Sequence, residues 1–232
     1  MKNTPFIAVT SQPVPYHADT TAIFNTLCQQ NSNSLLLDSA EIGSKNSLQS
    51  LILINAAVKI TCLGNQVTFR ALNANGKQML KEIHPVLSQL GTVSTVNFDN
   101  EFSVQFAPLD NQLDEDSKLQ AATIFDGLRV ISNHYQHSST PVFLGGLFAY
   151  DLVANFIPMQ GVELKDDGIH CPDYSFYLAE NLITIDHQSQ QATLKSFCFS
   201  QEEQVEVAKT ALSIAQKLRN IDGVLSIKAA SD

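Results

Sequence analysis

Cysteine and histidine side chains can act as nucleophiles, proton carriers or metal ligands when their spacing brings them together. The four cysteines, Cys28, Cys62, Cys171 and Cys198, are far apart and form no Cys-x-x-Cys pair, which argues against a metal site or a disulfide framework. Cys28 and Cys198 have apolar neighbours, a setting typical of buried thiols that pack as small hydrophobic groups. We therefore expect structural thiols, with no catalytic residue and no metal ligand among them.

The histidines give one spacing that could bind a metal ion. His134 and His137 are three residues apart, so a helix would place both rings on one face. No His-Glu-x-x-His pattern accompanies them, and the polar sequence around them favours a solvated surface. The chain also contains no P-loop, Gly-x-Gly-x-x-Gly or Gly-x-Ser-x-Gly motif, so neither a phosphate cradle nor a nucleophile elbow is indicated.

The first half of the chain alternates helical and strand patterns. Residues 1–18 contain three prolines and are expected to run extended along a surface. The pair Gly64-Asn65 predicts a hairpin turn, and Pro85 predicts a kink or a break in the helix that contains it. Apolar periodicity predicts helices at 19–30 and 77–90, and strands at 35–37, 50–63, 66–72, 92–98 and 102–106.

The second half continues the alternation. Ile124, Leu128 and Ile131 recur at helical spacing and predict one helix over 116–134. A strand is expected over the first half of the segment 141–156, and Gly145-Gly146 within it should allow another backbone to approach closely. Further strands are expected at 174–185 and 193–199, and the capping box Ser200-x-x-Glu203 predicts a final helix from there to about residue 220.

These elements define the expected fold class and domain organisation. The predicted strands outnumber what a parallel strand–helix–strand fold would give, and hairpins dominate, so we expect an α+β fold with antiparallel sheets and hairpins packed against several helices. Residues 1–222 are expected to form one domain. Residues 223–232 have no cap and no following partner for their apolar side chains, so we expect the start of a linker there.

Composition limits the class of protein. Hydrophobic residues make up 44% of the 232, enough for a core, and the apolar runs are shorter than the roughly 18 residues that a membrane span needs. A net charge of −9 argues against a nucleic-acid partner, because phosphates require a basic surface. The N-terminal residues do not resemble a secretory signal, so we expect a cytoplasmic protein that binds neither nucleic acid nor membrane.

Two segments resemble a known enzyme family. The sequence LLLDSAEI at 35–42, followed by Ser44-Lys45, resembles the Leu-Leu-(Glu/Asp)-Ser-Ala signature of anthranilate synthase component I. The sequence FLGGLFAYDLVANF at 143–156 resembles the Gly-Gly-Leu-x-x-Tyr-Asp region that precedes the catalytic half of that family. Supporting stretches lie at 50–64 and 171–188, and the likeness extends from about Phe6 to the final helix.

The resemblance implies an activity for a longer protein. Members of the family convert chorismate and ammonia into anthranilate and pyruvate with Mg²⁺, and a glutamine amidotransferase, component II, supplies the ammonia. Their chorismate- and magnesium-binding half lies C-terminal to the region that this sequence resembles. We therefore expect the N-terminal regulatory domain alone, with no catalytic residue and no cofactor in these 232 residues and no activity without the missing catalytic half.

The signature also implies a feedback site for L-tryptophan as inhibitor. Leu37 would line the indole, Asp38 would face the ammonium group or orient the backbone, and Ser39 would offer its hydroxyl and backbone groups. Pattern alone favours a plainer interpretation, in which Asp38 and Ser39 only turn the chain after a strand. A departure from many family members is Gln49, which stands where they have a lysine near the inhibitor.

Several alternatives stay open. The domain could belong to aminodeoxychorismate synthase component I, a sister enzyme, or could be a stand-alone amino-acid-binding regulatory module. The acidic stretch 110–116 could dock a partner, although a solvated turn is the expected interpretation. Tyr150 and Asp151 could contact another domain, or could simply end a hydrogen-bonded strand.

Overall fold

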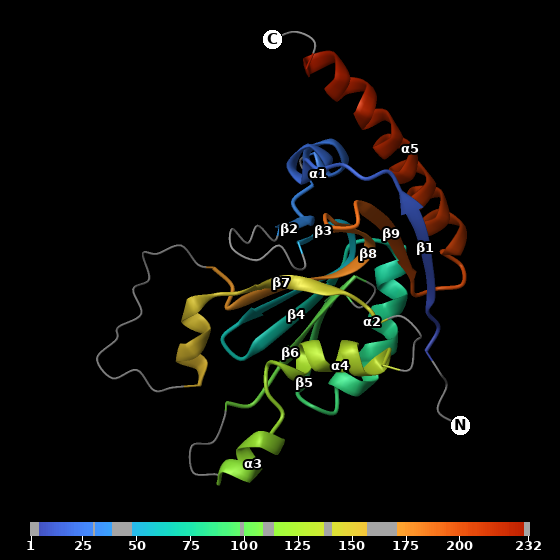
Figure 1. The fold of residues 1–232 in the computed structure, drawn as a ribbon. Helices are drawn as coiled ribbons and strands as arrows, with labels where there is room; N and C mark the ends of the chain where they lie inside the picture. Colours follow the sequence, from blue (N-terminus) through green and yellow to red (C-terminus); the bar gives the residue numbers. More distant parts are fainter. Residues whose placement is uncertain are drawn as a thin grey trace. The chain divides into compact units, whose positions relative to one another are not determined.

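The computed structural model describes residues 5–29, 31–38, 48–97, 100–108, 114–136, 141–156 and 171–229. Within these residues every paired strand is antiparallel, which confirms the expected α+β class (Figure 1). Contacts divide the chain into two compact units. The first comprises Met1–Pro5 and Val58–Leu178, and the second comprises Phe6–Ala57 and Ala179–Asp232. Two long strands, β3 (Gln49–Leu63) and β8 (Tyr174–Asp186), each contribute one part to each unit.

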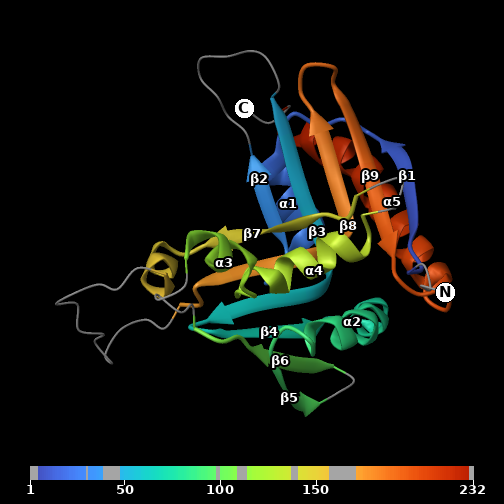
Figure 2. The same cartoon turned by 90° about the horizontal axis from the view of Figure 1, so that it is seen from below.

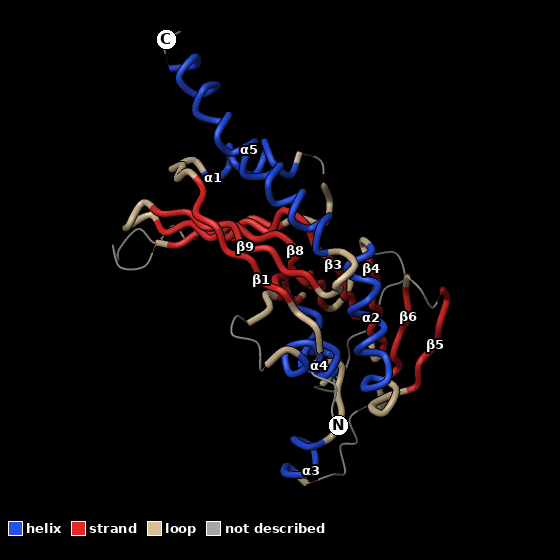
Figure 3. Tube along the Cα trace, turned by 90° about the vertical axis from the view of Figure 1, so that its right-hand side faces the viewer, coloured by secondary structure: helices blue, strands red, loops and turns tan. Residues whose placement is uncertain are grey.

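The second unit is a sheet covered by two helices. Its strands follow the order β1-β9-β8-β3, and β2 pairs with β3. Helices α1 and α5 lie on one side of β1, β8 and β9, as Figure 3 shows. Besides its parts of β3 and β8, the unit contains β1 (Ala8–Val14), α1 (Thr20–Cys28), β2 (Leu35–Asp38), β9 (Gln191–Cys198) and α5 (Gln204–Ala229).

The core of the second unit follows from strand and helix periodicity. Ile52 and Ile54 on β3, and Ile183 and Ile185 on β8, are two residues apart and therefore point to the same face. The apolar stripes of α1 and α5 cover that face, and each fully buried aliphatic side chain contributes about 1.5–3 kcal/mol. The cluster is completed by Ile23, Cys28, Ala192, Leu194, Ala211, Ile214, Leu218 and Ile221.

The first unit contains a second antiparallel array. Its strands follow the order β3-β4-β6-β5, and β7 pairs with β8; Figure 2 shows β4, β6 and β5 side by side. The predicted turn at Gly64-Asn65 joins β3 to β4, with Gly64 at φ 57°. The elements are β4 (Gln66–Ala71), α2 (Ala74–Leu87), β5 (Thr92–Asn97), β6 (Glu101–Gln105), α3 (Glu115–Gln120), α4 (Asp126–His134), β7 (Leu144–Phe148) and the 3₁₀ helix η1 (Tyr150–Asn155).

Close packing in the first unit explains the glycine at position 146. A Cβ on Gly146 would lie 2.2 Å from the carbonyl oxygen of Ser175 and 2.6 Å from the Cα of Phe176. The expectation that Gly146 lets another backbone come close is therefore confirmed. In the same unit, the rings of Phe69 on β4 and Phe102 on β6 stack with their centroids 5.1 Å apart.

The predicted helix over 116–134 is wrong, because two helices are present. Helix α3 ends at Gln120, and α4 begins at Asp126, whose carboxylate accepts a hydrogen bond from the N–H of Thr123 at 2.7 Å. This contact fixes the intervening turn, which apolar spacing could not reveal. Of the two histidines expected on a solvated surface, His137 lies outside the described residues. His134 is partly buried, with its side chain 20% exposed and its Nε2 3.1 Å from a carboxylate oxygen of Glu82.

Other element boundaries moved for local reasons. Pro85 does not break α2, because it lies in the last turn, and Asn73 caps the helix start by accepting from the N–H of Gly76. Ser200 accepts from the N–H of Glu202 and so opens a turn, while α5 itself runs Gln204–Ala229 rather than 200–220. Residues 1–18, expected to be extended, include strand β1, which pairs only with β9 and can therefore hold Pro13.

Candidate functional site

Two of the three predicted tryptophan-site residues end strand β2. In the antiparallel register, Leu37 lies opposite Leu51 and Asp38 lies opposite Ser50. Leu37 is 42% exposed, so it offers an apolar surface that the core does not use. Ser39 lies outside the described residues.

The carboxylate of Asp38 is held by hydroxyl groups from two other elements. Thr20, the first residue of α1, donates its hydroxyl to Oδ2 at 3.2 Å, and Ser50 of β3 donates to Oδ1. Thr20 and Ser50 are both buried, whereas Asp38 is exposed. The two buried hydroxyls therefore fix the direction of an exposed carboxylate.

Behind Ser50 the hydrogen-bonded chain continues to an imidazole and a phenol. The Oγ of Ser50 lies 2.8 Å from Nε2 of His187, and Nδ1 of His187 lies 3.2 Å from the hydroxyl of Tyr16. The hydroxyl of Ser50 has one proton, which it gives to Asp38, so it must accept from Nε2–H of His187. Nδ1 then accepts from Tyr16 when the ring is neutral and donates to it when the ring is protonated.

The turn after β8 fixes the position of His187. Its backbone N–H donates to the carbonyl of Leu48 at 3.0 Å, and the Asp186 carboxylate accepts from the N–H groups of Gln188 and Ser189. The hydrogen bond from Ser189 lowers the pKa of Asp186. The imidazole is therefore held by its backbone as well as by Ser50 and Tyr16.

Serine, histidine and aspartate in contact could suggest a hydrolytic triad, but the order of the contacts excludes one. In a triad the carboxylate orients the histidine, whereas here Asp38 accepts the serine proton directly. Ser50 is also completely buried, so no substrate could reach its oxygen. Each carboxylate oxygen of Asp38 can accept a further hydrogen bond from the exposed side, so the arrangement fits recognition of a cation.

Sequence reasoning missed four of these partners. Tyr16, Thr20 and His187 lie far from Asp38 along the chain, and no motif connects them. Ser50 alone had a usable signal, because pairing the predicted strands in an antiparallel hairpin would have brought it opposite Asp38. Gln49, the departure from the family pattern, is exposed at the first position of β3.

Cys28 and Cys198 are buried, as expected from their apolar neighbours. All four are free thiols, and Cys28, Cys62 and Cys198 are buried while Cys171 is exposed. Burial, with a smaller contribution from the charge of Asp173, raises the pKa of Cys62 to about 12. In the part of the chain that the structure describes, no cluster of three His, Cys, Asp or Glu side chains could hold a metal ion.

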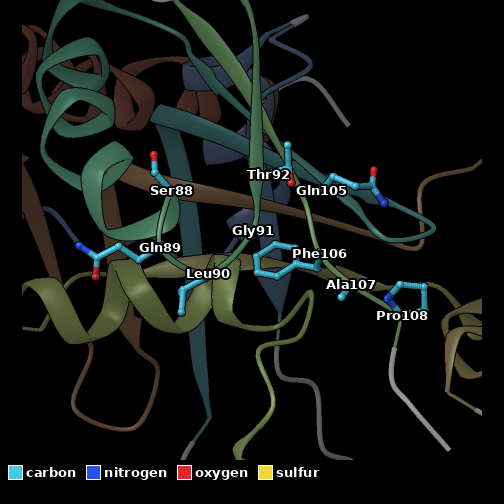
Figure 4. Close-up of a pocket in the computed structure, with 9 residues that line it drawn as sticks. All are labelled: Ser88, Gln89, Leu90, Gly91, Thr92, Gln105, Phe106, Ala107 and Pro108. Carbon is cyan, nitrogen blue, oxygen red and sulfur yellow. The ribbon is translucent and has the colours of Figure 1, made fainter.

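A separate pocket in the first unit offers little chemistry. It has a volume of about 480 Å³ and lies between the end of α2 and the strands β5 and β6 (Figure 4). Its lining carries no charged side chain and consists of Ser88, Gln89, Leu90, Gly91, Thr92, Gln105, Phe106, Ala107 and Pro108. The other predicted contact residues, Tyr150 and Asp151, lie in η1 and are exposed.

The second unit thus presents an exposed carboxylate whose direction is fixed by two hydroxyl groups. The chain is 84% identical over 227 residues to anthranilate synthase component 1 of Haemophilus influenzae, a match that covers 98% of this chain and 44% of that protein. It is 44% identical over 202 residues to the Vibrio cholerae protein of the same name, covering 86% of this chain and 38% of that one. For the Escherichia coli protein the identity is 36% over 199 residues, covering 84% and 37%. No family model matches the chain.

These likenesses confirm the resemblance that the two sequence motifs carry: the chain corresponds to the N-terminal region of anthranilate synthase component I. It spans less than half the length of each of these relatives. Among the described helices, none combines the length and the apolar character needed to cross a bilayer.

Proposed function

We propose that this chain is the regulatory region of an anthranilate synthase component I and carries part of its feedback site for L-tryptophan. In the whole protein, chorismate and ammonia would give anthranilate and pyruvate in tryptophan biosynthesis. Catalysis would depend on Mg²⁺ and on residues outside this chain. A glutamine amidotransferase, component II, would supply the ammonia.

The oriented carboxylate of Asp38 is the observation that carries the proposal. Tryptophan presents an ammonium, a carboxylate and an indole, so its site needs an acceptor, donors and an apolar wall. Asp38 supplies an acceptor at the exposed end of β2. Leu37, one residue earlier in the strand, is exposed on the opposite face, so other side chains would supply the apolar wall for the indole. Ser39, the next residue along the chain, would donate from its hydroxyl.

The plainer interpretation, in which Asp38 only turns the chain, accounts less well for these contacts. A carboxylate that serves a turn accepts from the backbone N–H groups that follow it, as Asp186 does. Asp38 instead accepts from side chains of α1 and β3. A ligand ammonium would add a charge-assisted hydrogen bond to this fixed acceptor, which is worth about 1.5–3 kcal/mol.

The test uses the full-length protein with component II. Replacing Asp38 by Asn keeps the shape and one carbonyl oxygen but removes the charge, so we expect about tenfold more tryptophan for half-inhibition. The rate with chorismate at zero tryptophan should stay within about twofold, because no substrate contact is lost. Asp19→Asn, which retains the cap of α1, serves as the control. Equal inhibition of the Asp38 variant and the unaltered protein would refute the proposal.

A further inference from the structure

We propose that His187 is a positioning residue of this site: through Ser50 it holds the carboxylate of Asp38 in the direction that a ligand ammonium requires. The inference rests on the proposed function and extends it to a residue in the turn between β8 and β9. His187 does not contact the ligand in this account. It acts by donating a hydrogen bond from Nε2–H to Ser50, so that the Ser50 hydroxyl donates its own proton to Asp38.

The hydrogen bonds of Ser50 have directions that depend on where the imidazole of His187 carries its proton. The hydroxyl of Ser50 could donate either to the carboxylate of Asp38 or to Nε2 of His187, if that nitrogen carries no proton. The Oγ of Ser50 is 2.8 Å from Nε2 of His187 and also contacts Oδ1 of Asp38. When Nε2 carries the proton, the only acceptor left for Ser50 is the carboxylate.

The contact between Tyr16 and His187 favours the tautomer whose proton is on Nε2. The hydroxyl of Tyr16 lies 3.2 Å from Nδ1 and can donate to it, which leaves the ring proton on Nε2. The Tyr16 and His187 rings also meet edge to face, with centroids 5.8 Å apart. Tyr16 therefore supports the tautomer with its proton on Nε2, His187 donates to Ser50, and Ser50 donates to Asp38.

Burial strengthens the contact between Ser50 and His187. Ser50 is fully buried and His187 is half-buried, so water competes poorly for the contact between them. Without the Nε2 donor, the Ser50 hydroxyl can rotate among other orientations, and Oδ1 of Asp38 loses its fixed partner. The carboxylate would then be held by Thr20 alone.

Two substitutions separate the roles of the two ring nitrogens. Glutamine is long enough to place an amide N–H near the position of Nε2, whereas asparagine reaches only to that of Nδ1. In the full-length protein with component II, we expect His187→Asn to need about five- to tenfold more tryptophan for half-inhibition. His187→Gln should stay within about twofold of the unaltered protein, and both should keep the uninhibited rate with chorismate.

A double-mutant cycle with Ser50→Ala tests whether the effect passes through Ser50. Because the alanine removes the relay, adding His187→Asn to it should raise the half-inhibitory concentration by less than about twofold. Ser196→Ala is the matched control, since Ser196 is a buried serine of the same unit that bonds to Asn181 instead. It should leave inhibition by tryptophan unchanged.

The outcomes distinguish this inference from the proposed function. Weaker inhibition in His187→Asn, rescue by glutamine and non-additivity with Ser50→Ala together support the positioning role. If Asp38→Asn weakens inhibition while His187→Asn does not, or if the Ser50 and His187 effects simply add, the positioning role is refuted and the proposed function stands. If the unaltered protein is not inhibited by tryptophan, both are refuted.

Discussion

Asp38 owes its direction to two hydroxyl groups that come from different elements, unlike Asp19, Asp114 and Asp186. Asp19, Asp114 and Asp186 accept from backbone N–H groups close to them in sequence, which is the usual role of aspartate at helix starts and turns. Asp38 accepts from Thr20 and Ser50, which lie 18 and 12 residues away. Its orientation therefore depends on the tertiary structure of the second unit.

The cysteines give a prediction at the same scale. Because the thiolate is the reactive form and three of the thiols are buried, only Cys171 should react rapidly with a thiol reagent at pH 8. The raised pKa of Cys62, about 12, keeps that thiol protonated well above pH 8. In this chain, titration with an aromatic disulfide should release about one equivalent quickly and the other three only on unfolding. Rapid reaction of all four, or loss of the fast phase in a variant other than Cys171→Ser, would contradict the burial described.

At the scale of elements, sequence patterns predicted strands and hairpins correctly where one face of a strand is buried. They failed to predict a helix break where a single side chain fixes a turn. The hairpin at Gly64-Asn65 and the β8–β9 hairpin were predicted, because turn chemistry and strand alternation are local signals. The break between α3 and α4 was missed, because it depends on one contact between Asp126 and Thr123. The site was predicted only at Leu37, Asp38 and Ser39, because its other members come from distant segments that only the folded sheet brings together.

Strand β7 provides a test of packing at this scale. Gly146→Ala would push a methyl group into the backbone of Ser175 and Phe176, which cannot yield as a flexible side chain could. We expect the free energy of unfolding to fall by about 2–3 kcal/mol, as overpacked positions usually do. Gly64→Ala is the comparison: nothing lies within 4 Å of its Cβ position, so only the positive φ costs energy, about 1 kcal/mol.

Urea unfolding of the two variants, followed by circular dichroism, measures both values. The Gly146 variant should be the less stable of the two. A Gly146 variant as stable as the unaltered chain would show that β7 does not pack on β8 in the register described.

At the scale of the whole molecule, the chain corresponds to less than half of its relatives, and the proposed site should reflect this. The family resemblance implies that the catalytic half would supply the opposite wall of the proposed tryptophan pocket. Leaving some 80 Å² of indole exposed would cost roughly 2 kcal/mol, or about thirtyfold in affinity, at about 25 cal/mol per Å². We therefore expect these 232 residues alone to bind tryptophan at least about thirtyfold more weakly than the full-length protein and to form no anthranilate.

Titration calorimetry and the fluorescence of anthranilate measure the two quantities. Anthranilate formation by the 232 residues alone would contradict the assignment of catalysis to the rest of the protein. Equal tryptophan affinity of this chain and the full-length protein would show that the site is complete within it.

The most direct test of the central claim is the inhibition of the full-length Ser39→Ala variant, assayed with component II, chorismate and glutamine. A feedback site that is distinct from the catalytic one couples to it by about 1–3 kcal/mol, so its loss can be separated from turnover. We expect this variant to need at least about fivefold more tryptophan for half-inhibition, while its rate without tryptophan stays within about twofold. A variant that is inhibited as readily as the unaltered protein, or that loses turnover in proportion to inhibition, would contradict the central claim.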